Sequence, residues 1–292
     1  RRQRQMCIRD SIPAFYERWF LRRLEVGEAV VRNPYSRTPY QVSLLPQDVD
    51  GFVFWTRNAA PFQAGLQAVS AMGRPFVVQY TVTGYPSLLE PGVPPLQHAS
   101  AVIAGLANEY GRACTVWRYD PIVFSTLTPP DWHRRQFGLI AASLSNAVDE
   151  VTVSFAHYYK KSVRNLRRLT GSADFAWTDP PDDEKSAFIR SLAAIAEDYG
   201  LRLTICSQPH LEQSGIAGAS CIDAHRLSAI AGRPITANQK GNRAGCLCAE
   251  SRDIGAYDSC AHGCVYCYAV RDHAAARTAV KDHSDQAPGL RL

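Results

Sequence analysis

Short apolar runs alternate along most of the chain with longer segments whose apolar residues recur at helical spacing. The short runs predict strands over residues 29–31, 49–55, 76–82, 114–117, 150–155 and 201–206. The longer segments predict helices over residues 12–26, 61–72, 100–110, 136–147, 159–169, 182–199 and 269–280. Pro13 suits a first helical turn and Gly27 suits a helix end. Alternating strands and helices are typical of an α/β fold with a parallel sheet.

We predict a full or partial (β/α) barrel of about six parallel strands, with its core over residues 12–206. Residues 207–292 carry cysteines, glycines and polar residues but few strand signals. We expect them to form a Cys-rich segment packed over the C-terminal ends of the strands, where α/β folds bind their ligands. The last part, residues 282–292, has the composition of an ordinary tail.

Residues 1–11 do not fit this scheme. The run from Gln5 to Ser11 resembles a translated sequencing adapter, so we expect residues 1–11 to be a non-native or disordered tail and give Cys7 no role. A genuine basic N-terminal tail is the alternative.

Composition narrows the class of protein. The chain has 292 residues, 46% of them hydrophobic, which is enough for one large domain. No apolar run is long enough to span a bilayer and no stretch resembles a signal peptide, so we expect a cytoplasmic protein without a membrane partner. Nine cysteines in such a chain indicate metal chemistry in a reducing compartment rather than disulfides. A net charge of +5 only weakly favours an anionic partner.

One stretch near the C-terminal end carries the strongest chemical signal. Cys260, Cys264 and Cys267 are separated by three and then two residues, and the aromatic Tyr266 precedes the third cysteine. Three thiolates this close can reach one small inorganic centre. A [4Fe–4S] cluster normally takes four cysteines, so three leave one iron open to a substrate. Structural zinc and unliganded thiols are the alternatives.

The spacing and the aromatic residue resemble the signature of the radical S-adenosylmethionine enzymes, and residues 260–269 resemble the cluster loop of their spore photoproduct lyase branch. The chain as a whole resembles a family described as a domain of unknown function with cysteines of this type at its C-terminus. The stretches that carry this resemblance are residues 12–16, 32–34, 54–58, 81–85, 117–122, 220–223 and 251–255. The residues before Ile12 depart from the resemblance. It implies a permuted arrangement in which the cluster loop follows the barrel and reaches the strand ends from the other end of the chain.

The resemblance implies that S-adenosylmethionine chelates the open iron, is cleaved reductively and generates a 5′-deoxyadenosyl radical, with a reductase such as flavodoxin or ferredoxin as electron donor and an unknown substrate. The backbone near Tyr266 is expected to contact adenine. Polar strand-end residues are the candidates for binding the carboxylate and the ribose: Thr56, Arg57, Thr83, Arg118, Asp120 and His157. Each has the simpler interpretation of a structural residue, and Arg118 and Asp120 could pair with each other.

Four further cysteines predict a second centre: Cys206, Cys221, Cys246 and Cys248. Four thiolates match the requirement of an auxiliary [4Fe–4S] cluster. A structural zinc site and buried free cysteines are the alternatives.

The helix predicted over residues 159–169 is basic, with Lys160, Arg164 and Arg168 on one face. A solvated helix face explains this pattern, but a nucleic-acid backbone is a second interpretation. Three hypotheses follow: a radical S-adenosylmethionine enzyme, a nucleic-acid repair or modification enzyme of the same type, and a non-catalytic zinc or iron–sulfur module.

Overall fold

The computed structural model of the chain describes residues 6–8, 11–33, 36–169, 175–213, 215–241 and 244–291. Eight of the described strands form one sheet in the order β11-β10-β8-β6-β5-β4-β1-β12, and every neighbouring pair in it is parallel. The strands of this sheet are β1 (Met6–Ile8), β4 (Phe52–Thr56), β5 (Phe76–Thr81), β6 (Thr115–Ile122), β8 (Glu150–Phe155), β10 (Arg202–Ile205), β11 (Ala217–Gly218) and β12 (Arg252–Asp253). Two antiparallel pairs lie outside it: β2 (Glu28–Arg32) with β3 (Pro39–Ser43), and β7 (Phe124–Ser125) with β9 (Trp177–Thr178).

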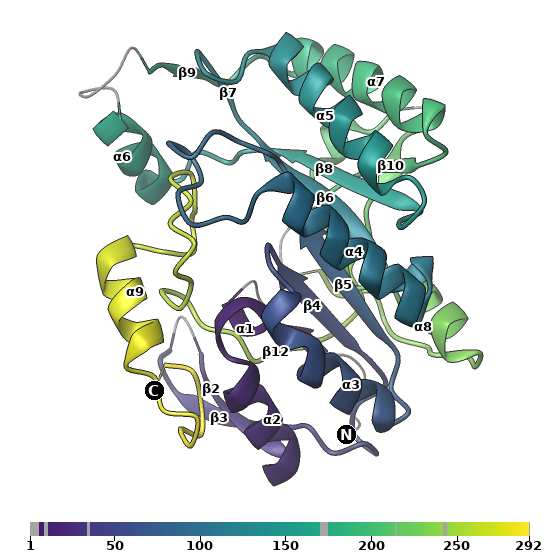
Figure 1. The fold of residues 1–292 in the computed structure, drawn as a ribbon, viewed down its shortest axis with the longest axis vertical. Coiled ribbons are helices and arrows are strands. Elements are labelled where there is room, and N and C mark those ends of the chain that lie inside the picture. The colour runs from purple at the N-terminus through teal and green to yellow at the C-terminus, as the bar shows by residue number, and fades with distance from the viewer. Residues whose placement is uncertain are drawn as a thin grey trace.

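Helices connect most of these strands (Figure 1). They are α1 (Ser11–Phe15), α2 (Glu17–Val26), α3 (Gln63–Ala71), α4 (Leu96–Tyr110), α5 (Pro130–Leu144), α6 (Lys160–Leu169), α7 (Asp182–Asp198), α8 (Ala224–Ala231) and α9 (His273–Lys281). Short 3-10 turns occur at η1 (Ala60–Phe62), η2 (Arg112–Cys114) and η3 (Pro209–Leu211). As predicted, α2 ends at Gly27, which takes a left-handed conformation with φ of 81°.

The predicted α/β class and parallel sheet are confirmed. Closure into a barrel is not seen: in the described part of the chain, β11 and β12 are the two edges of the sheet and do not pair with each other. The strand predicted over residues 29–31 forms as β2, but it pairs only with β3 and lies outside the main sheet.

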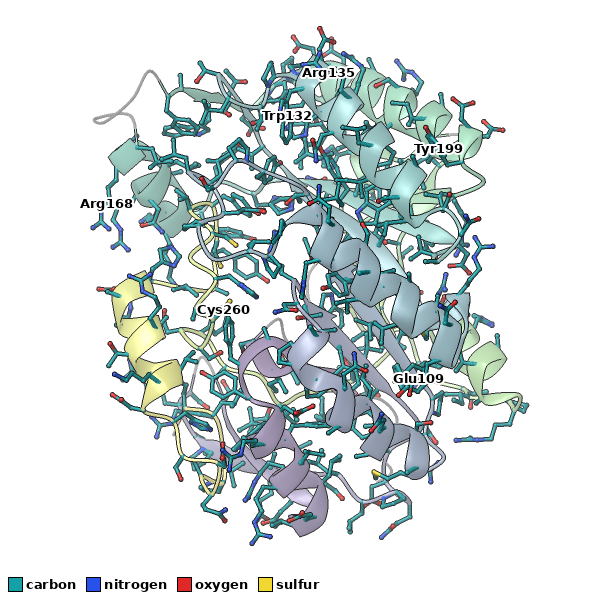
Figure 2. All side chains as sticks on the ribbon, viewed as in Figure 1. Glu109, Trp132, Arg135, Arg168, Tyr199 and Cys260 are labelled. Carbon is teal, nitrogen blue, oxygen red and sulfur yellow. The ribbon has the colours of Figure 1, made fainter. Side chains whose placement is uncertain are left out.

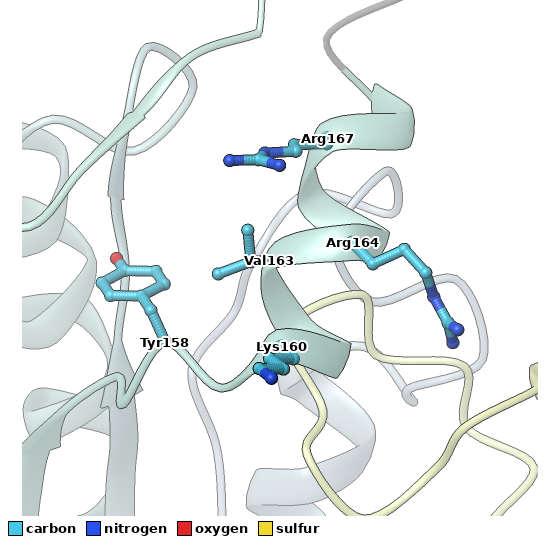
Figure 3. A pocket seen from close by; sticks show the side chains of 5 residues that line it. All are labelled: Tyr158, Lys160, Val163, Arg164 and Arg167. Carbon is cyan, nitrogen blue, oxygen red and sulfur yellow. The ribbon is translucent and has the colours of Figure 1, made fainter.

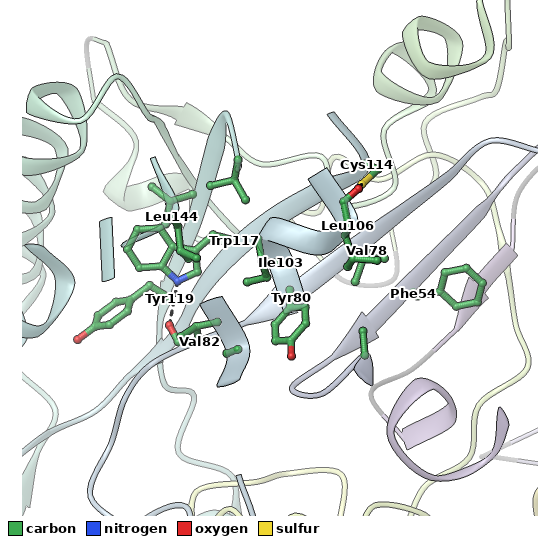
Figure 4. Packing of buried hydrophobic residues seen from close by; sticks show 14 of the residues in the cluster. Phe54, Val78, Tyr80, Val82, Ile103, Leu106, Cys114, Trp117, Tyr119 and Leu144 are labelled. Carbon is green, nitrogen blue, oxygen red and sulfur yellow. Dashed lines mark hydrogen bonds between the residues drawn. The ribbon is translucent and has the colours of Figure 1, made fainter. Parts of the chain in front are cut away.

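One face of the sheet is apolar and is covered by helices. Phe54, Val78 and Trp117 point to this side and join one continuous core with Ile103 of α4 and Phe137 of α5. Figure 4 shows part of this packing, including the hydrogen bond that the Trp117 indole donates to the carbonyl of Val82 over 2.9 Å. Burial of large side chains on this face provides most of the hydrophobic stabilisation of the fold.

The second face of the sheet is partly polar. Its residues alternate with those of the core, so that Val53, Val77 and Val116 cluster with Cys206, Cys221, Cys248 and Leu227 of the C-terminal third. Thr81, Arg118, Thr152 and Thr204 lie in register across four neighbouring strands on this same face. The Cys-rich segment therefore does not lie only over the strand ends as predicted, since much of it covers the second face.

The expectation that residues 1–11 carry no fold information is wrong for Met6–Ile8 and Ser11. Strand β1 lies inside the sheet, with Met6 opposite Phe52 of β4 and Arg252 of β12. Ser11 begins α1, and its hydroxyl bonds that of Ser259 over 2.8 Å. A strand this short is specified by its neighbours, which local sequence does not reveal. Residues 1–5 and 9–10 lie outside the described residues, and only the backbone of Cys7 is described.

The chain after Asp282 is packed rather than an ordinary tail. The Trp19 indole donates to the carbonyl of Ala287 over 2.8 Å, and the amide of Val30 donates to Pro288 over 2.7 Å. Leu290 is buried. This segment thereby covers α2 and β2, which explains why Trp19 is fully buried. Leu292 lies outside the described residues.

Candidate functional site

The segment of residues 260–269, here called the cysteine loop, lies beyond the C-terminal ends of the central strands (Figure 1). It is held by the loop that follows β5. The amide of Val265 donates to Leu89 over 3.0 Å, and the amide of Gly92 donates to His262 over 2.9 Å. A ring nitrogen of His262 also bonds the carbonyl of Gly92 over 2.8 Å. The cysteine loop therefore lies at the strand ends, although it comes after the sheet strands in the chain.

The contact between the two loops depends on a glycine. A Cβ atom at Gly92 would lie 2.7 Å from the carbonyl oxygen of His262, closer than a Cβ can approach an oxygen. Within the cysteine loop itself, Gly263 has a φ of 77°, a conformation that side chains disfavour. These two glycines allow the cysteine loop to turn against the strand ends.

The three cysteines of the loop differ in burial. Cys264 is buried among Tyr85, Leu89 and Tyr266, while Cys260 and Cys267 are half-buried. Figure 2 places Cys260 between α9 and α1, and the adjacent Ser259 accepts a hydrogen bond from the Tyr16 hydroxyl over 2.9 Å.

Burial raises the pKa of the Cys264 thiol well above its usual value, and Glu90, Cys267 and Cys260 raise it further, whereas Arg57 lowers it. The Cys260 and Cys267 thiols therefore both lie close enough to Cys264 to affect its pKa. In the described parts of the chain, no three His, Cys, Asp or Glu side chains are already arranged to hold a metal ion. The donor set fits a three-thiolate iron–sulfur cluster in type and number, and the loop is short enough for all three to turn to one centre.

A buried network ties Tyr266 to the strand ends. Arg57, just after β4, pairs through Nη1 with Glu90 Oε1 at 2.8 Å and donates from Nη2 to the Tyr266 hydroxyl over 2.6 Å. The Thr83 hydroxyl, just after β5, donates to the same Glu90 oxygen over 2.7 Å, and the Tyr266 hydroxyl donates to it as well. Side-chain exposure is only 6% for Arg57 and 2% for Glu90. We call these four residues the anchor network.

Within the anchor network, Arg57, Thr83 and Tyr266 all donate to the carboxylate of Glu90. Burial raises the pKa of Tyr266 well above its usual value, Arg57 lowers it and Glu90 raises it, so the phenol stays protonated and donates. Its ring packs edge-on against that of Tyr85 at 5.7 Å between centroids. The structure thus brings together three of the residues that the sequence singled out.

Sequence reasoning missed Glu90, the acceptor at the centre of the network. It lies in a proline-rich loop that carries no regular pattern. The available signal was one carboxylate between Leu88-Leu89 and Pro91-Gly92, since a charge in an otherwise apolar stretch is usually paired when buried.

The remaining candidates lie elsewhere. The hydroxyl of Thr56 bonds the backbone of Asn58 on both its carbonyl, over 2.9 Å, and its amide, over 3.0 Å, so it holds a turn. Arg118 and Asp120 pair with each other, in agreement with the simpler interpretation of these residues. Arg118 faces Cys221, on the second face of the sheet. His157 is exposed, with its ring 6.1 Å from that of Tyr159.

The second set of cysteines gathers on the second face of the sheet. The sulfur atoms of Cys206 and Cys221 are 3.6 Å apart, and Cys248 joins them through Cys221. Cys246 joins through Cys248. Here too the sequence grouped residues that the fold brings together.

Helix α6 borders an open groove of about 460 Å³, shown in Figure 3, whose lining residues are Tyr158, Lys160, Val163, Arg164 and Arg167. The helix also touches the chain around the cysteine loop. Arg164 donates to the carbonyl of Arg271 over 2.7 Å, and Lys161 lies over the ring of Tyr257. The basic groove and the cysteine loop are therefore neighbours.

Among the described helices, none has the length and apolar character needed to cross a bilayer. Comparison with the curated proteins finds no significant match. The family model described as a domain of unknown function, DUF1848, matches residues 6–269, which include both sets of cysteines. Because the match begins at Met6, the expectation that all residues before Ile12 depart from the family is wrong. With most of its length inside this match, the chain belongs to the DUF1848 family of domains of unknown function.

Proposed function

We propose that this protein is a radical S-adenosylmethionine enzyme that binds a [4Fe–4S] cluster through Cys260, Cys264 and Cys267 and acts on a substrate that is still to be assigned. The observation that carries the proposal is the position of the cysteine loop. Three closely spaced cysteines with an aromatic residue before the third lie at the C-terminal ends of parallel strands, where α/β folds bind their ligands. We further propose that the parallel sheet acts as a partial (β/α) barrel around this site.

A cluster held by three thiolates leaves one iron for the amine and carboxylate of S-adenosylmethionine and, when reduced, supplies the electron that cleaves the sulfonium C–S bond to give a 5′-deoxyadenosyl radical. The chain's own residues position and shield this chemistry. Cys264 is buried with a raised pKa, so metal binding would release its proton. Tyr85 and Leu89 pack around Cys264 and exclude water.

The anchor network would fix the loop in the geometry that the cluster requires. Its buried ion pair binds the Tyr266 hydroxyl, so this hydroxyl is not available to a ligand. We therefore propose that the backbone near Tyr266, beside Cys267, contacts adenine. Asp120 and His157 remain proposed contacts for the carboxylate and the ribose, whereas Thr56 holds a turn and Arg118 faces Cys221 on the second face of the sheet. A small reductase such as flavodoxin or ferredoxin would supply the electron, and an exposed iron corner requires a reducing compartment such as the cytoplasm.

The test is anaerobic reconstitution of the full chain with iron and sulfide, followed by dithionite and S-adenosylmethionine. We expect 5′-deoxyadenosine and methionine in the product mixture, about four irons per chain at this site, and loss of both products in Cys264→Ser. Cys114→Ser is the matched control, because Cys114 is also buried but lies in the core, where it bonds Leu106 and Thr115. If the wild type carries the iron but yields no 5′-deoxyadenosine, the proposal fails and a non-catalytic iron–sulfur module is supported instead.

The basic groove beside α6 favours a nucleic acid as the second candidate substrate class. Lys160, Arg164 and Arg167 would contact phosphates, and Tyr158 offers a ring for a base. Binding of a single-stranded oligonucleotide should weaken steeply with salt and should weaken further in Lys160→Ala/Arg167→Ala. Binding that is insensitive to both would remove this candidate.

A further inference from the structure

We infer that Cys206, Cys221, Cys246 and Cys248 bind a second, thiophilic metal centre on the second face of the sheet. Three separate segments bring these side chains together. Cys206 follows β10, Cys221 follows β11, and Cys246 and Cys248 lie in the loop that precedes β12. Cys206, Cys221 and Cys248 are buried, and Cys246 is half-buried. This inference does not rest on the proposed function of the cysteine loop.

The thiols form a chain of contacts with Cys221 near its middle. Cys221 meets Cys206 at 3.6 Å between sulfur atoms and also interacts with Cys248, which in turn interacts with Cys246. Two sulfurs bound tetrahedrally at about 2.3 Å to one zinc ion are separated by about 3.8 Å, close to the first of these distances. The described side chains do not yet surround a single point. Rotation of the outer thiols, Cys206 and Cys246, would close the chain around one centre.

Two polar groups contact the sulfur atoms and would stabilise thiolates bound to a metal ion. Arg118 is 4% exposed, and its Nη1 lies 2.9 Å from the sulfur of Cys221. The amide of Ile222 donates to the sulfur of Cys248 over 3.4 Å. Four thiolates around a divalent ion carry a net charge of about −2, and a buried guanidinium with an amide donor offsets part of it. Buried cysteines that serve only as small hydrophobic residues need neither partner.

The backbone around the site is already shaped to hold the cysteines. A Cβ atom at Gly241 would lie 2.2 Å from the carbonyl oxygen of Cys246 and 2.5 Å from its Cβ, so only glycine permits this approach. The amide of Lys240 donates to the carbonyl of Cys248 over 2.9 Å. The amide of Ala249 donates to Ile222 over 3.0 Å, which ties the segment of Cys248 to that of Cys221. Such preorganisation by surrounding groups is typical of metal sites.

Two kinds of metal centre are bound by four cysteine thiolates and could occupy this site. A single zinc ion takes four cysteines as a closed structural site, and a fully ligated [4Fe–4S] cluster takes the same four thiolates and can relay electrons. The site stands on the same sheet as the cysteine loop but uses different residues. Loss of one centre therefore need not remove the other, and the two can be tested separately.

The experiment measures zinc, iron and acid-labile sulfide in anaerobically purified full-length protein. We expect Cys221→Ser and Cys248→Ser each to lose about one zinc per chain, or about four irons with their sulfides, relative to the wild type. Cys114→Ser should keep the full metal content. Cys264→Ser should keep the metal of the second-face site, which separates this inference from the proposed function.

Wild-type metal content in both Cys221→Ser and Cys248→Ser would overturn the inference. If these variants do not fold, X-ray absorption of the wild type decides instead. Four sulfur neighbours at about 2.3 Å around zinc, or iron and sulfide beyond the content of one cluster, would support the site. A wild-type protein with no zinc, and with no iron other than the iron that Cys264→Ser loses, would reject it.

Discussion

Glu90 should be the side chain on which the docking of the cysteine loop depends most. Its Oε1 accepts from Arg57 at 2.8 Å, from Thr83 at 2.7 Å and from Tyr266, in a site where the two charged side chains are at least 94% buried. Glu90→Ala leaves the guanidinium buried without its counter-charge. Breaking a buried ion pair by removing one partner costs about 3–5 kcal/mol. Glu90→Gln keeps an acceptor oxygen, so we expect a smaller loss of about 1–3 kcal/mol.

A double substitution separates the contribution of the ion pair to stability from the contribution of side-chain packing. Arg57→Met/Glu90→Leu removes both charges and refills the space, so its cost should fall below the sum of the single substitutions by about 2 kcal/mol. The measurement is urea unfolding of metal-free, reduced protein followed by circular dichroism. Glu197→Gln, at an exposed position near the end of α7, is the control and should change stability by less than about 0.5 kcal/mol.

A local measurement should accompany the global one. Glu90→Ala frees Tyr266, so alkylation of Cys264, followed by peptide mass spectrometry, should become faster while Cys114 stays protected. The reasoning is refuted if Glu90→Ala costs less than about 1 kcal/mol, or if the double substitution costs the full sum of the single ones. Either result would mean that the anchor network does not hold the loop.

Three further predictions use the same unfolding measurement. Gly92→Ala should destabilise by about 1–3 kcal/mol, because its Cβ meets the His262 carbonyl, whereas Gly105→Ala, in an open part of α4, should stabilise by about 0.5–1 kcal/mol. Tyr266→Phe should cost about 1–3 kcal/mol, since it removes the hydroxyl from the buried pair. Burial lowers the pKa of His133 to about 4 from 6.5, so the unfolded chain takes up a proton that the native state resists. Stability should therefore fall as pH drops from about 6.5 to about 4, by on the order of 3 kcal/mol, and His133→Gln should lack this part of the slope.

Each of these has an opposing outcome. Equal effects of the two glycine substitutions would argue against close docking of the cysteine loop. A Tyr266→Phe variant as stable as the wild type would show that the hydroxyl contributes nothing to the anchor. An unchanged pH profile in His133→Gln would place the acid sensitivity elsewhere.

Much of the site was visible in the sequence because its parts are local. The three cysteines of the loop lie within one short segment, so their spacing alone led us to propose a common ligand. Arg57 and Thr83 stand directly after apolar runs that predict strands, and parallel strands bring such positions to one edge of the sheet. Glu90 could not be found in this way, because nothing in its loop shows that it turns back to Arg57.

The sequence by itself determined the α/β class, the strands β4, β5, β6, β8 and β10 with the helices between them, the end of α2 at Gly27 and the grouping of cysteines into two sets. These follow from residue periodicity, backbone preference and donor chemistry, which act over a few residues. The tertiary structure alone decided that Met6–Ile8 enters the sheet, that the last residues cover α2, that the Cys-rich segment lies on the second face and that Arg118 faces Cys221. Those outcomes depend on contacts between segments far apart in the chain. The free energy of such contacts depends on the surface against which a segment packs, which the residues of that segment alone do not reveal.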